Sequence, residues 1–346
     1  MSAPSEEAPS EEVLRAAMRT AVELAEAARG TTSPNPPVGC VVLDAAGHVV
    51  GRGATQPPGG PHAEIVALRA AGTSAAGGTA VVTLEPCSHT GRTPPCTAAL
   101  REAGVARVAY AVSDPTLPSS GAAALRASDI DVRSGLLAEE VAAGPLRAWL
   151  HFARTGRPHV TWKYAATLDG RTAAADGTSR WISSEVSRAE VHQLRRQVDA
   201  IVVGTGTALA DDPHLTARDE RGDLLEHQPL RVVVGRRPLP DGAKLRDAAA
   251  ETVQLAGEPA AVLDELAARG VVDVLLEGGS ALAGGFVAAD RVDRVLAHIA
   301  PALLGAGPAA LGESGVGSIS QAWWLDVEKV SMSGSDVRVS AVRRAR

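Results

Sequence analysis

Apolar residues in the first half of the chain follow helical spacing in some segments and strand spacing in others. They recur every three or four positions over 13–25, which predicts an amphipathic helix. Two apolar runs joined by a short turn at 45–47 predict a pair of strands. The elements predicted here are further helices at 62–72 and 97–103 and strands at 39–43, 49–53, 79–84, 105–112 and 130–132. Together they predict a sheet with helices on both faces.

The second half also alternates strands with helices, but it ends in a hairpin. Its predicted strands are at 159–165, 200–203, 230–234, 272–277 and 292–300, and its predicted helices are at 184–197, 258–269 and 280–289. A Ser-Gly-Ser-Asp turn at 333–336 separates two final strands. This mixture predicts a three-layer α/β sheet with an antiparallel edge.

A polar turn at 154–158 separates the two halves of the chain. The length of 346 residues also exceeds what one hydrophobic core usually serves, which favours two domains. We therefore predict a disordered tail at 1–10, a first domain at 11–153 and a second domain at 157–346.

Composition and charge exclude several classes of protein. The net charge of -6 gives no basic surface for a nucleic-acid backbone. No apolar run is long enough to span a membrane, and the Pro-, Ser- and Glu-rich start does not have the pattern of a signal peptide. Of the three cysteines, two lie in a metal motif, which indicates a reducing compartment. We expect a cytoplasmic enzyme that binds neither nucleic acid nor membranes.

One motif in the first half predicts metal chemistry. Glu64 lies two residues after His62, and eight residues separate Cys87 from Cys96. One imidazole and two thiolates fill three tetrahedral positions on Zn²⁺ and leave the fourth for water, which is the ligand count of a catalytic zinc. Glu64 is better placed as a proton carrier beside that water. We therefore predict a zinc-dependent nucleobase deaminase with Glu64 as its catalytic residue.

Other interpretations of the residues near this motif stay open. A structural zinc would need a fourth protein ligand, and His89 is the nearby candidate. Cys40 lies in an apolar run, so we expect it in the core and not at the metal. Asn35 precedes a proline and either begins a turn or contacts a substrate.

The motifs taken together resemble the bifunctional deaminase/reductase family of riboflavin biosynthesis. The segments that carry this resemblance are the zinc motif with its insert at 91–95, then 34–40, 163–171, 179–183, 210–216, 277–279 and 300–301. The resemblance implies a cytidine-deaminase-like three-layer α/β/α domain followed by a dihydrofolate-reductase-like α/β domain. It covers nearly the whole chain.

The resemblance also implies two reactions. The first is deamination of 2,5-diamino-6-ribosylamino-4(3H)-pyrimidinone 5′-phosphate, and the second is NADPH-dependent reduction of the ribosyl chain to give 5-amino-6-ribitylamino-uracil 5′-phosphate. Alternatives are a paralogue acting on a related pyrimidine in a specialised pathway, a deaminase with an inactive reductase half, and a nucleotide-binding sensor. A sensor would have no use for Glu64 or for an open zinc position.

Further residue roles follow from the resemblance. The implied substrate contacts are Asn35, His89, Lys163, Ser179, Arg195, Leu215, Arg218 and Glu277. The implied NADPH contacts are Ala165, Trp181, Thr207, Asp211, Gly278, Gly279 and Ser280. Taken without the resemblance, the glycines fit a helix cap as well as a diphosphate site. The two arginines fit either an ordinary surface or a substrate phosphate. We also expect a homo-oligomer, a dimer or a tetramer.

Three positions depart from the family pattern. Thr55 and Thr116 stand where the family usually has histidine and asparagine, and both positions belong to the deaminase substrate pocket. The strand that ends before Gly235 is not followed by the usual Asp-Ser pair, which affects the cofactor side of the second half.

Overall fold

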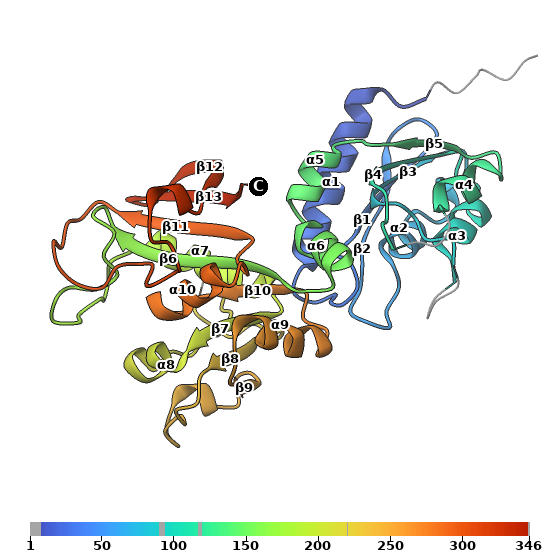
Figure 1. Ribbon diagram of the computed structural model, residues 1–346. Coiled ribbons are helices and arrows are strands. Elements are labelled where there is room, and N and C mark those ends of the chain that lie inside the picture. Colours follow the sequence, from blue (N-terminus) through green and yellow to red (C-terminus); the bar gives the residue numbers. More distant parts are fainter. Residues whose placement is uncertain (1–7, 90–93, 117–119, 220, 345–346) are drawn as a thin grey trace, which may run out of the picture. The chain divides into compact units, whose positions relative to one another are not determined.

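The computed structural model describes residues 8–89, 94–116, 120–219 and 221–344 (Figure 1). The chain divides into two compact units, Met1–Gly156 and Arg157–Arg346, and each unit has a sheet of its own. Most of the predicted tail and much of the 91–95 insert lie outside the described residues. Among the residues that the structure describes, no helix is long and apolar enough to cross a membrane.

The first unit contains a five-stranded sheet with the order β2-β1-β3-β4-β5. β1 (Gly39–Leu43) is antiparallel to β2 (Val49–Ala54) and to β3 (Thr79–Leu84). β4 (Arg107–Val112) and β5 (Asp131–Ser134) continue the sheet in parallel with β3. The residues of β1 and β3 are all buried, because helices cover both of their sides.

Two glycines allow helices to lie close against this sheet. A Cβ atom on Gly39 would overlap the Ala21 carbonyl of α1 (Glu11–Ala28), and one on Gly53 would overlap the Ala63 carbonyl of α2 (Ala63–Ala71). Gly53 is the ladder partner of Cys40, the neighbour of Gly39, so the two glycines face opposite sides of the sheet. α1 and α2 therefore cover opposite faces, which confirms the predicted layering (Figure 1).

The remaining helices of the first unit are short. They are the 3-10 turn Gly72–Ala75, α3 (Cys96–Glu102), α4 (Gly121–Arg126), α5 (Ala138–Ala143) and α6 (Arg147–Thr155). α6 continues into the predicted turn and ends at Gly156, whose left-handed conformation (φ 72°) suits a glycine.

The second unit contains an eight-stranded sheet with the order β12-β13-β11-β6-β10-β7-β8-β9. The parallel strands are β6 (His159–Thr167), β7 (Ala200–Gly204), β8 (Leu230–Val234), β9 (Thr252–Leu255), β10 (Asp273–Leu276) and β11 (Arg294–Ala300). β12 (Leu325–Ser333) and β13 (Asp336–Arg343) form a hairpin whose β13 pairs antiparallel with β11. The predicted antiparallel edge is therefore confirmed.

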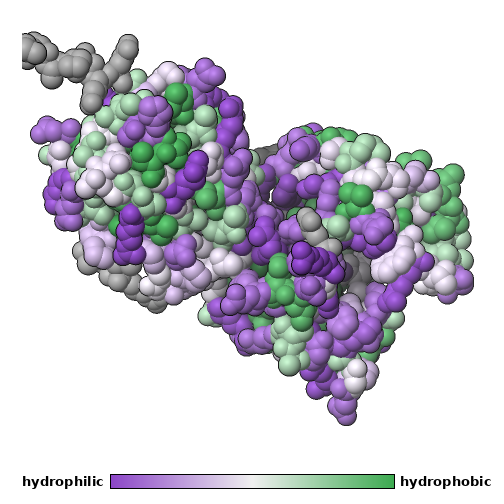
Figure 2. Space-filling model, turned by 180° about the vertical axis from the view of Figure 1, so that it is seen from behind, coloured by the Kyte–Doolittle hydropathy of each residue, from purple (hydrophilic) through white to green (hydrophobic). Residues whose placement is uncertain are grey.

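Helices cover both faces of the second sheet as well. They are α7 (Glu185–Gln197), α8 (Thr205–Asp211), α9 (Pro259–Ala268) and α10 (Ser280–Ala288), with 3-10 turns at Lys244–Arg246 and Ile319–Gln321. One core cluster joins Trp162 and Val202 to Leu263 of α9 and Phe286 of α10. A second core cluster contains Ile201. Ile201 is the neighbour of Val202 along β7, so this cluster lies on the opposite face of the sheet. On the view of Figure 2, the surface of this unit is polar with separate apolar patches, one of them at its outer edge.

Among the elements that were not predicted are α8 and β9. α8 begins directly after β7, and its opening residues, Thr205, Gly206 and Thr207, have low helix propensity. β9 is four residues long with partly exposed side chains, which is too short for a clear periodicity.

A buried arginine holds two loops of the second unit. The Arg231 side chain on β8 is 0% exposed. Its Nη1 donates to the His214 and Lys244 carbonyls and to the Asp247 carboxylate (2.8 Å), and its Nη2 donates to the Asp247 and Ala250 carbonyls. The loops around 214 and 244–250 are therefore tied to one side chain.

We expect Arg231→Met to destabilise the second unit, because several acceptors would lose a charged donor. The expected loss is about 2–3 kcal/mol in a denaturant titration, below the range for fully buried pairs because Asp247 is partly exposed. Arg236→Met is the matched control, since Arg236 is exposed just beyond the same strand. Equal stability of the two variants would show that other contacts hold the loops.

Candidate functional site

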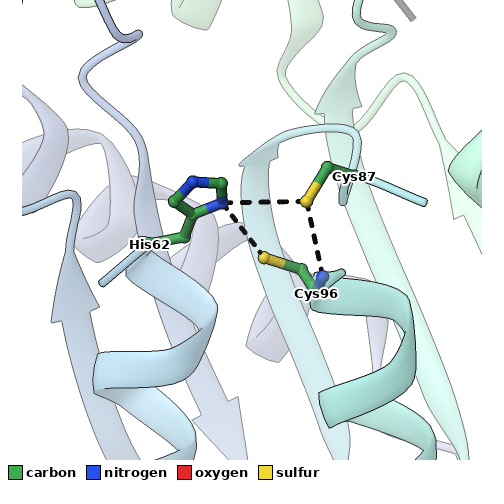
Figure 3. A group of neighbouring side chains, drawn as sticks. All are labelled: His62, Cys87 and Cys96. Carbon is green, nitrogen blue, oxygen red and sulfur yellow. Dashed lines mark hydrogen bonds between the residues drawn. The ribbon is translucent and has the colours of Figure 1, made fainter. Parts of the chain in front are cut away.

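Local structure places the three predicted zinc ligands at the edge of the first sheet. His62 is the N-cap of α2, Cys96 is the first residue of α3, and Cys87 follows the carboxyl end of β3 (Figure 3). The Cys96 N–H donates to the Cys87 sulfur (3.4 Å), and the Thr97 N–H donates to the Cys87 carbonyl (3.1 Å). These bonds hold the two cysteine segments together.

The ligand atoms are spaced for one metal ion. The His62 Nδ1 lies 3.3 Å from the Cys96 sulfur and 3.7 Å from the Cys87 sulfur. A tetrahedral zinc with Zn–N of about 2.05 Å and Zn–S of about 2.3 Å separates nitrogen from sulfur by about 3.6 Å. Among the described residues, these three are the one group of His, Cys, Asp or Glu side chains that is spaced to hold a metal ion. Neither His89 nor Cys40 belongs to it. Three protein ligands fit a catalytic zinc and give no support to a structural one.

The side chains of the group shift one another's acidity. Hydrogen bonds from Cys96 and His62 lower the pKa of Cys87 to about 4, against the effect of burial. The neighbouring Cys87 sulfur and burial raise the pKa of Cys96. The hydrogen bond with Cys87 raises the pKa of His62. A negative charge on Cys87 is therefore favoured before any metal binds, as a zinc ligand requires.

Glu64 lies beside the metal group in the first turn of α2 and is 4% exposed. Burial raises the pKa of its carboxyl above the usual value, and the Cys87 sulfur adds to the shift. A carboxyl whose pKa moves toward neutrality can both accept and donate a proton. The geometry therefore allows the predicted acid–base function.

A cavity of about 670 Å³ opens onto this group. The predicted residues that line it are Asn35, His62, Glu64, Cys87 and His89. Sequence analysis missed Trp149 and Phe152 of α6, which also line it. Their spacing of three residues on a helix was visible, but the sequence does not show that α6 lies at the cavity.

Two of the departures from the family pattern lie in the same cavity. The Thr55 hydroxyl oxygen accepts a hydrogen bond from the Val38 N–H (3.1 Å). Thr116 donates from its N–H (2.8 Å) and its hydroxyl (2.6 Å) to the Asp114 carboxylate. Both threonines therefore fix neighbouring backbone segments.

A separate cavity of about 410 Å³ lies in the second unit. The predicted residues that line it are Lys163, Ser179, Trp181, Arg195, Asp211 and Glu277. Basic residues that were not predicted also line it, namely Arg180, Arg188, His192, His214 and Lys244. The guanidinium carbon of Arg188 lies 4.5 Å from the Trp181 ring centre. Asp211, Asp212 and Glu277 also line the cavity, and burial lowers the pKa of His192. The permanently charged groups suited to an anionic ligand are therefore the arginines.

Two of the residues that line this cavity form a bidentate ion pair. Arg195 donates from Nε and Nη2 to the two carboxylate oxygens of Glu277, each at 2.8 Å. Burial would raise the pKa of Glu277, but Arg195 and, to a smaller extent, Lys163 hold it below the usual value. Burial lowers the pKa of Lys163, and Glu277 opposes that shift. The guanidinium group of Arg195 therefore binds Glu277, which differs from the expected contact of Arg195 with a substrate phosphate.

The other predicted residues of the second unit do not line this cavity. Leu215 is 3% exposed in a core cluster, and the Arg218 side chain donates to Thr216 and to the Gly222 carbonyl. Ala165 lies on β6 beside His298. The remaining ones, Thr207, Gly278, Gly279 and Ser280, lie where β7 and β10 end.

Close contacts hold together the segments that follow β7, β8 and β10. The Gly279 N–H donates to the Thr207 hydroxyl (3.0 Å), which joins the starts of α8 and α10. Gly235 has φ 138°, and a Cβ atom there would overlap the Thr205 side chain. Only glycine fits where β8 ends, so the departure at this position has a local structural cause.

Both units match known protein families. Residues 11–112 match the cytidine and deoxycytidylate deaminase zinc-binding region, and residues 158–339 match the RibD C-terminal domain. The chain is 53% identical over 330 residues to the riboflavin biosynthesis protein RibD of Mycobacterium tuberculosis, which covers 95% of this chain and 97% of that protein. It is 41% identical over 323 residues to RibD of Escherichia coli, covering 83% and 88%.

Solved structures agree over the same length. Acinetobacter baumannii RibD is 33% identical with a TM-score of 0.87, covering 97% of this chain and 100% of that one. The diaminohydroxyphosphoribosylaminopyrimidine deaminase/5-amino-6-(5-phosphoribosylamino)uracil reductase of Thermotoga maritima is 32% identical with a TM-score of 0.88, covering 96% and 99%. Because the similarity extends through both units, the chain belongs to the RibD family of bifunctional riboflavin-biosynthesis enzymes, with a zinc deaminase in its first unit and a reductase in its second.

Proposed function

We propose that this chain deaminates 2,5-diamino-6-ribosylamino-4(3H)-pyrimidinone 5′-phosphate and then reduces the ribosyl chain with NADPH, giving 5-amino-6-ribitylamino-uracil 5′-phosphate. The observation that carries the proposal is the meeting of His62, Cys87 and Cys96 with Glu64 at one cavity. The similarity to bifunctional relatives over both units supports the second step.

In the first step, one amino group of the pyrimidine is exchanged for oxygen from water, and ammonia leaves. Zinc held by His62, Cys87 and Cys96 would supply an activated water. Glu64 would carry two protons in turn: the first from water to a ring nitrogen, and the second from the hydroxyl newly added to the ring carbon to the departing amine, which leaves a carbonyl group and ammonia. Asn35 and His89 orient the pyrimidine. The apolar sides of Trp149 and Phe152 exclude water from the ring.

In the second step, NADPH would supply a hydride to C1 of the ribosyl group, opened to its imine or aldehyde form. Gly278 and Gly279 precede α10, which begins at Ser280, and the N–H groups of its first turn can bind the cofactor's phosphates. The other proposed cofactor contacts are Ala165, Trp181, Thr207 and Asp211.

The substrate of the second step lies, in this proposal, on the side of Lys163, Ser179 and Glu277. The lowered pKa of Glu277 favours its ionised form, and Lys163 contacts the ribose or its phosphate. Because Arg195 is engaged by Glu277, the proposed phosphate-binding groups are the other cations of the cavity, with Arg188 foremost. Leu215 and Arg218 would contact a substrate only through their own backbone atoms, or after the loop that contains them changes conformation.

We further propose that the enzyme acts as a homo-oligomer in the cytoplasm. The match of both units to riboflavin proteins favours this function over a deaminase with an inactive reductase half. A paralogue for a related pyrimidine is the remaining alternative.

One assay separates these functions. The zinc-loaded chain is incubated with the diamino-pyrimidine phosphate and NADPH, and ammonia release and NADPH oxidation are followed separately. Both signals are expected. Ammonia alone would indicate an inactive reductase half, and the absence of both would indicate a different substrate.

The zinc ligands are tested by Cys96→Ser. We expect about one zinc per wild-type chain by elemental analysis, and an affinity at least ~100-fold lower in the variant because one of three ligands is weakened. Deamination should be lost with the metal. Cys40→Ala is the control, since Cys40 is buried in β1 and should leave zinc content unchanged. Full zinc and full deamination in Cys96→Ser would refute the ligand assignment.

The proton carrier is tested by Glu64→Gln. Zinc should remain bound, but deamination should fall by ~10²–10⁴-fold, the range for removal of a general acid–base group. Given the deaminated ribosylamino-uracil phosphate, the variant should oxidise NADPH at nearly the normal rate.

Lys163→Ala is the reciprocal variant for the second step. Ammonia release should continue while NADPH oxidation stops and the unreduced uracil accumulates. Loss of both activities in a folded, zinc-loaded Glu64→Gln chain would contradict two independent sites.

The function of Arg195 is tested by comparing Arg195→Met with Arg188→Met. Arg195→Met leaves Glu277 without its charged partner, so kcat/KM for reduction should fall by roughly 10–150-fold, equivalent to about 1.5–3 kcal/mol. The loss should be equal for phosphorylated and dephosphorylated substrate. Arg188→Met should affect the phosphorylated substrate more. A loss confined to phosphorylated substrate in Arg195→Met would instead show that Arg195 binds the phosphate.

A further inference from the structure

A buried histidine of the second unit has one ring nitrogen without a hydrogen-bond partner. His298 lies on β11 and is 1% exposed. Its Nε2 lies 3.4 Å from a carboxylate oxygen of Glu190 on α7, whereas its Nδ1 has no partner among the described residues. Leaving a buried polar atom without a partner costs free energy, so such atoms are rare in folded proteins. A donor for Nδ1 is therefore expected among its neighbours.

The contact with Glu190 decides which nitrogen of the neutral ring carries the hydrogen. A carboxylate accepts hydrogen bonds, so Nε2 carries the hydrogen and Nδ1 keeps a lone pair. Glu190 also pairs at 3.5 Å with Arg338 of β13, which is the ladder neighbour of His298. The carboxylate therefore lies between a guanidinium and the imidazole, and Nδ1 remains as an acceptor.

The surroundings of His298 keep its ring neutral. The charged groups that act on it are Lys163 of β6, Glu190 of α7 and Arg338 of β13. Burial makes the largest contribution to lowering the pKa of His298, Lys163 lowers it further, and Glu190 opposes the shift. Near neutral pH the ring is therefore uncharged, and its Nδ1 can accept a hydrogen bond but cannot donate one.

Lys163 lies on the strand next to His298 and on the same face of the sheet. In the register of β6 and β11, Lys163 lies beside Leu296, two residues before His298. Residues two apart on a strand point to one face. A strand spacing of about 4.8 Å and a rise of about 3.3 Å per residue put the Cα atoms of Lys163 and His298 roughly 8 Å apart. The flexible four-carbon stem of a lysine can bring its ammonium to Nδ1 across this distance.

Lys163 also has an acceptor on its other side. Glu277 directly follows β10, and the strand order places β6 between β10 and β11. Both carboxylate oxygens of Glu277 already accept hydrogen bonds from Arg195. An ammonium has three hydrogens to donate, so a second acceptor would restrict its position further. His298 offers that acceptor.

We propose that His298 is a positioning residue for the reduction: its neutral ring accepts a hydrogen bond from Lys163 at Nδ1 and holds the ammonium between His298 and Glu277, where it meets the ribosyl group. The contact forms by rotation of the lysine side chain between staggered rotamers. Protonation of His298 turns the acceptor into a donor and adds a charge beside the ammonium, so Lys163 is released. The inference rests on the proposed function of the second unit, in which Lys163 contacts the substrate.

The pH dependence of the reduction tests this function of His298. The full-length, zinc-loaded chain is given deaminated ribosylamino-uracil phosphate and NADPH, and kcat and KM are measured from about pH 5 to about pH 9, which spans histidine titration. In wild type, kcat should fall as the pH decreases through the lowered pKa of His298. His298→Asn keeps an acceptor near the position of Nδ1 but does not titrate. It should keep most of kcat and remain active to lower pH.

His298→Leu removes the acceptor. It should lower kcat by roughly 10–150-fold, the range for one hydrogen bond to a charged group, and leave KM for NADPH unchanged. His192 and His214 also line the cavity and are the same in all variants, so a change in the pH profile reports on His298. Equal losses of kcat in the Asn and Leu variants, with the acid limb unmoved, would show a structural function and overturn the proposal.

NMR of the histidine ring nitrogens tests the contact without turnover. Lys163→Met should raise the pKa of His298, because a neighbouring cation is removed, and the Nδ1 signal should lose the shift of a hydrogen-bond acceptor. An unchanged Nδ1 signal would refute the contact. If no form of the chain reduces the substrate, the proposed function of the second unit fails, and this titration still decides whether Lys163 binds His298.

His159→Asn is the matched control, because His159 is a buried histidine (4% exposed) at the start of β6. It should change neither the pH profile of the reduction nor the pKa of His298. Near-ultraviolet circular dichroism shows whether each variant is folded. If His298→Leu does not fold, His298→Asn and the NMR titration of wild type against Lys163→Met decide the outcome.

Discussion

Parallel strands all end at one edge of a sheet, and both sites of this protein depend on that constraint. In the first unit β3 ends shortly before Cys87, so the metal group forms at the edge where β3 and its parallel neighbour β4 end. In the second unit β7 and β10 are neighbours, and they lead to Thr207 and Gly279. Their hydrogen bond joins residues that are far apart in sequence because two parallel strands deliver them to the same place.

Each site contains a glutamate with little exposure to solvent, and the surroundings of the two give them opposite properties. Burial dominates at Glu64, so its pKa is raised and its carboxyl can exchange protons. At Glu277 the guanidinium of Arg195 and the ammonium of Lys163 outweigh burial, so the pKa is lowered and the ionised form is favoured. The first glutamate fits chemistry that moves protons. The second fits a fixed negative charge that orders its neighbours.

The sequence predicted the parts of the sites that rest on local spacing. Cys87 and Cys96 come together at one metal group because a strand, a short connection and the start of a helix follow one another along the chain. The spacing of apolar and polar residues predicts that order. The pairing of Arg195 with Glu277 joins α7 to the end of β10. These residues are far apart in sequence, so no local spacing predicts that they meet. Trp149 enters the first cavity because of how α6 packs, which periodicity alone does not specify.

The layers of both units were predictable for a similar reason. Continuous apolar strands separated by amphipathic helices admit few arrangements other than a sheet between helices. The fully buried Arg231 was not predictable, because an arginine in a strand ordinarily faces water, and its loop partners lie beyond the strand.

The unequal acidities of the two cysteines bear on the oxidation chemistry of the protein. A thiolate at Cys87 beside a protonated Cys96 is the combination from which disulfides form when an oxidant is present. A disulfide and a bound zinc need the same two sulfurs, so each excludes the other. Oxidation of the metal-free chain would remove two of three ligands in one event, whereas bound metal protects both. A disulfide between Cys87 and Cys96 would thus cost the chain its zinc and, with the zinc, deamination.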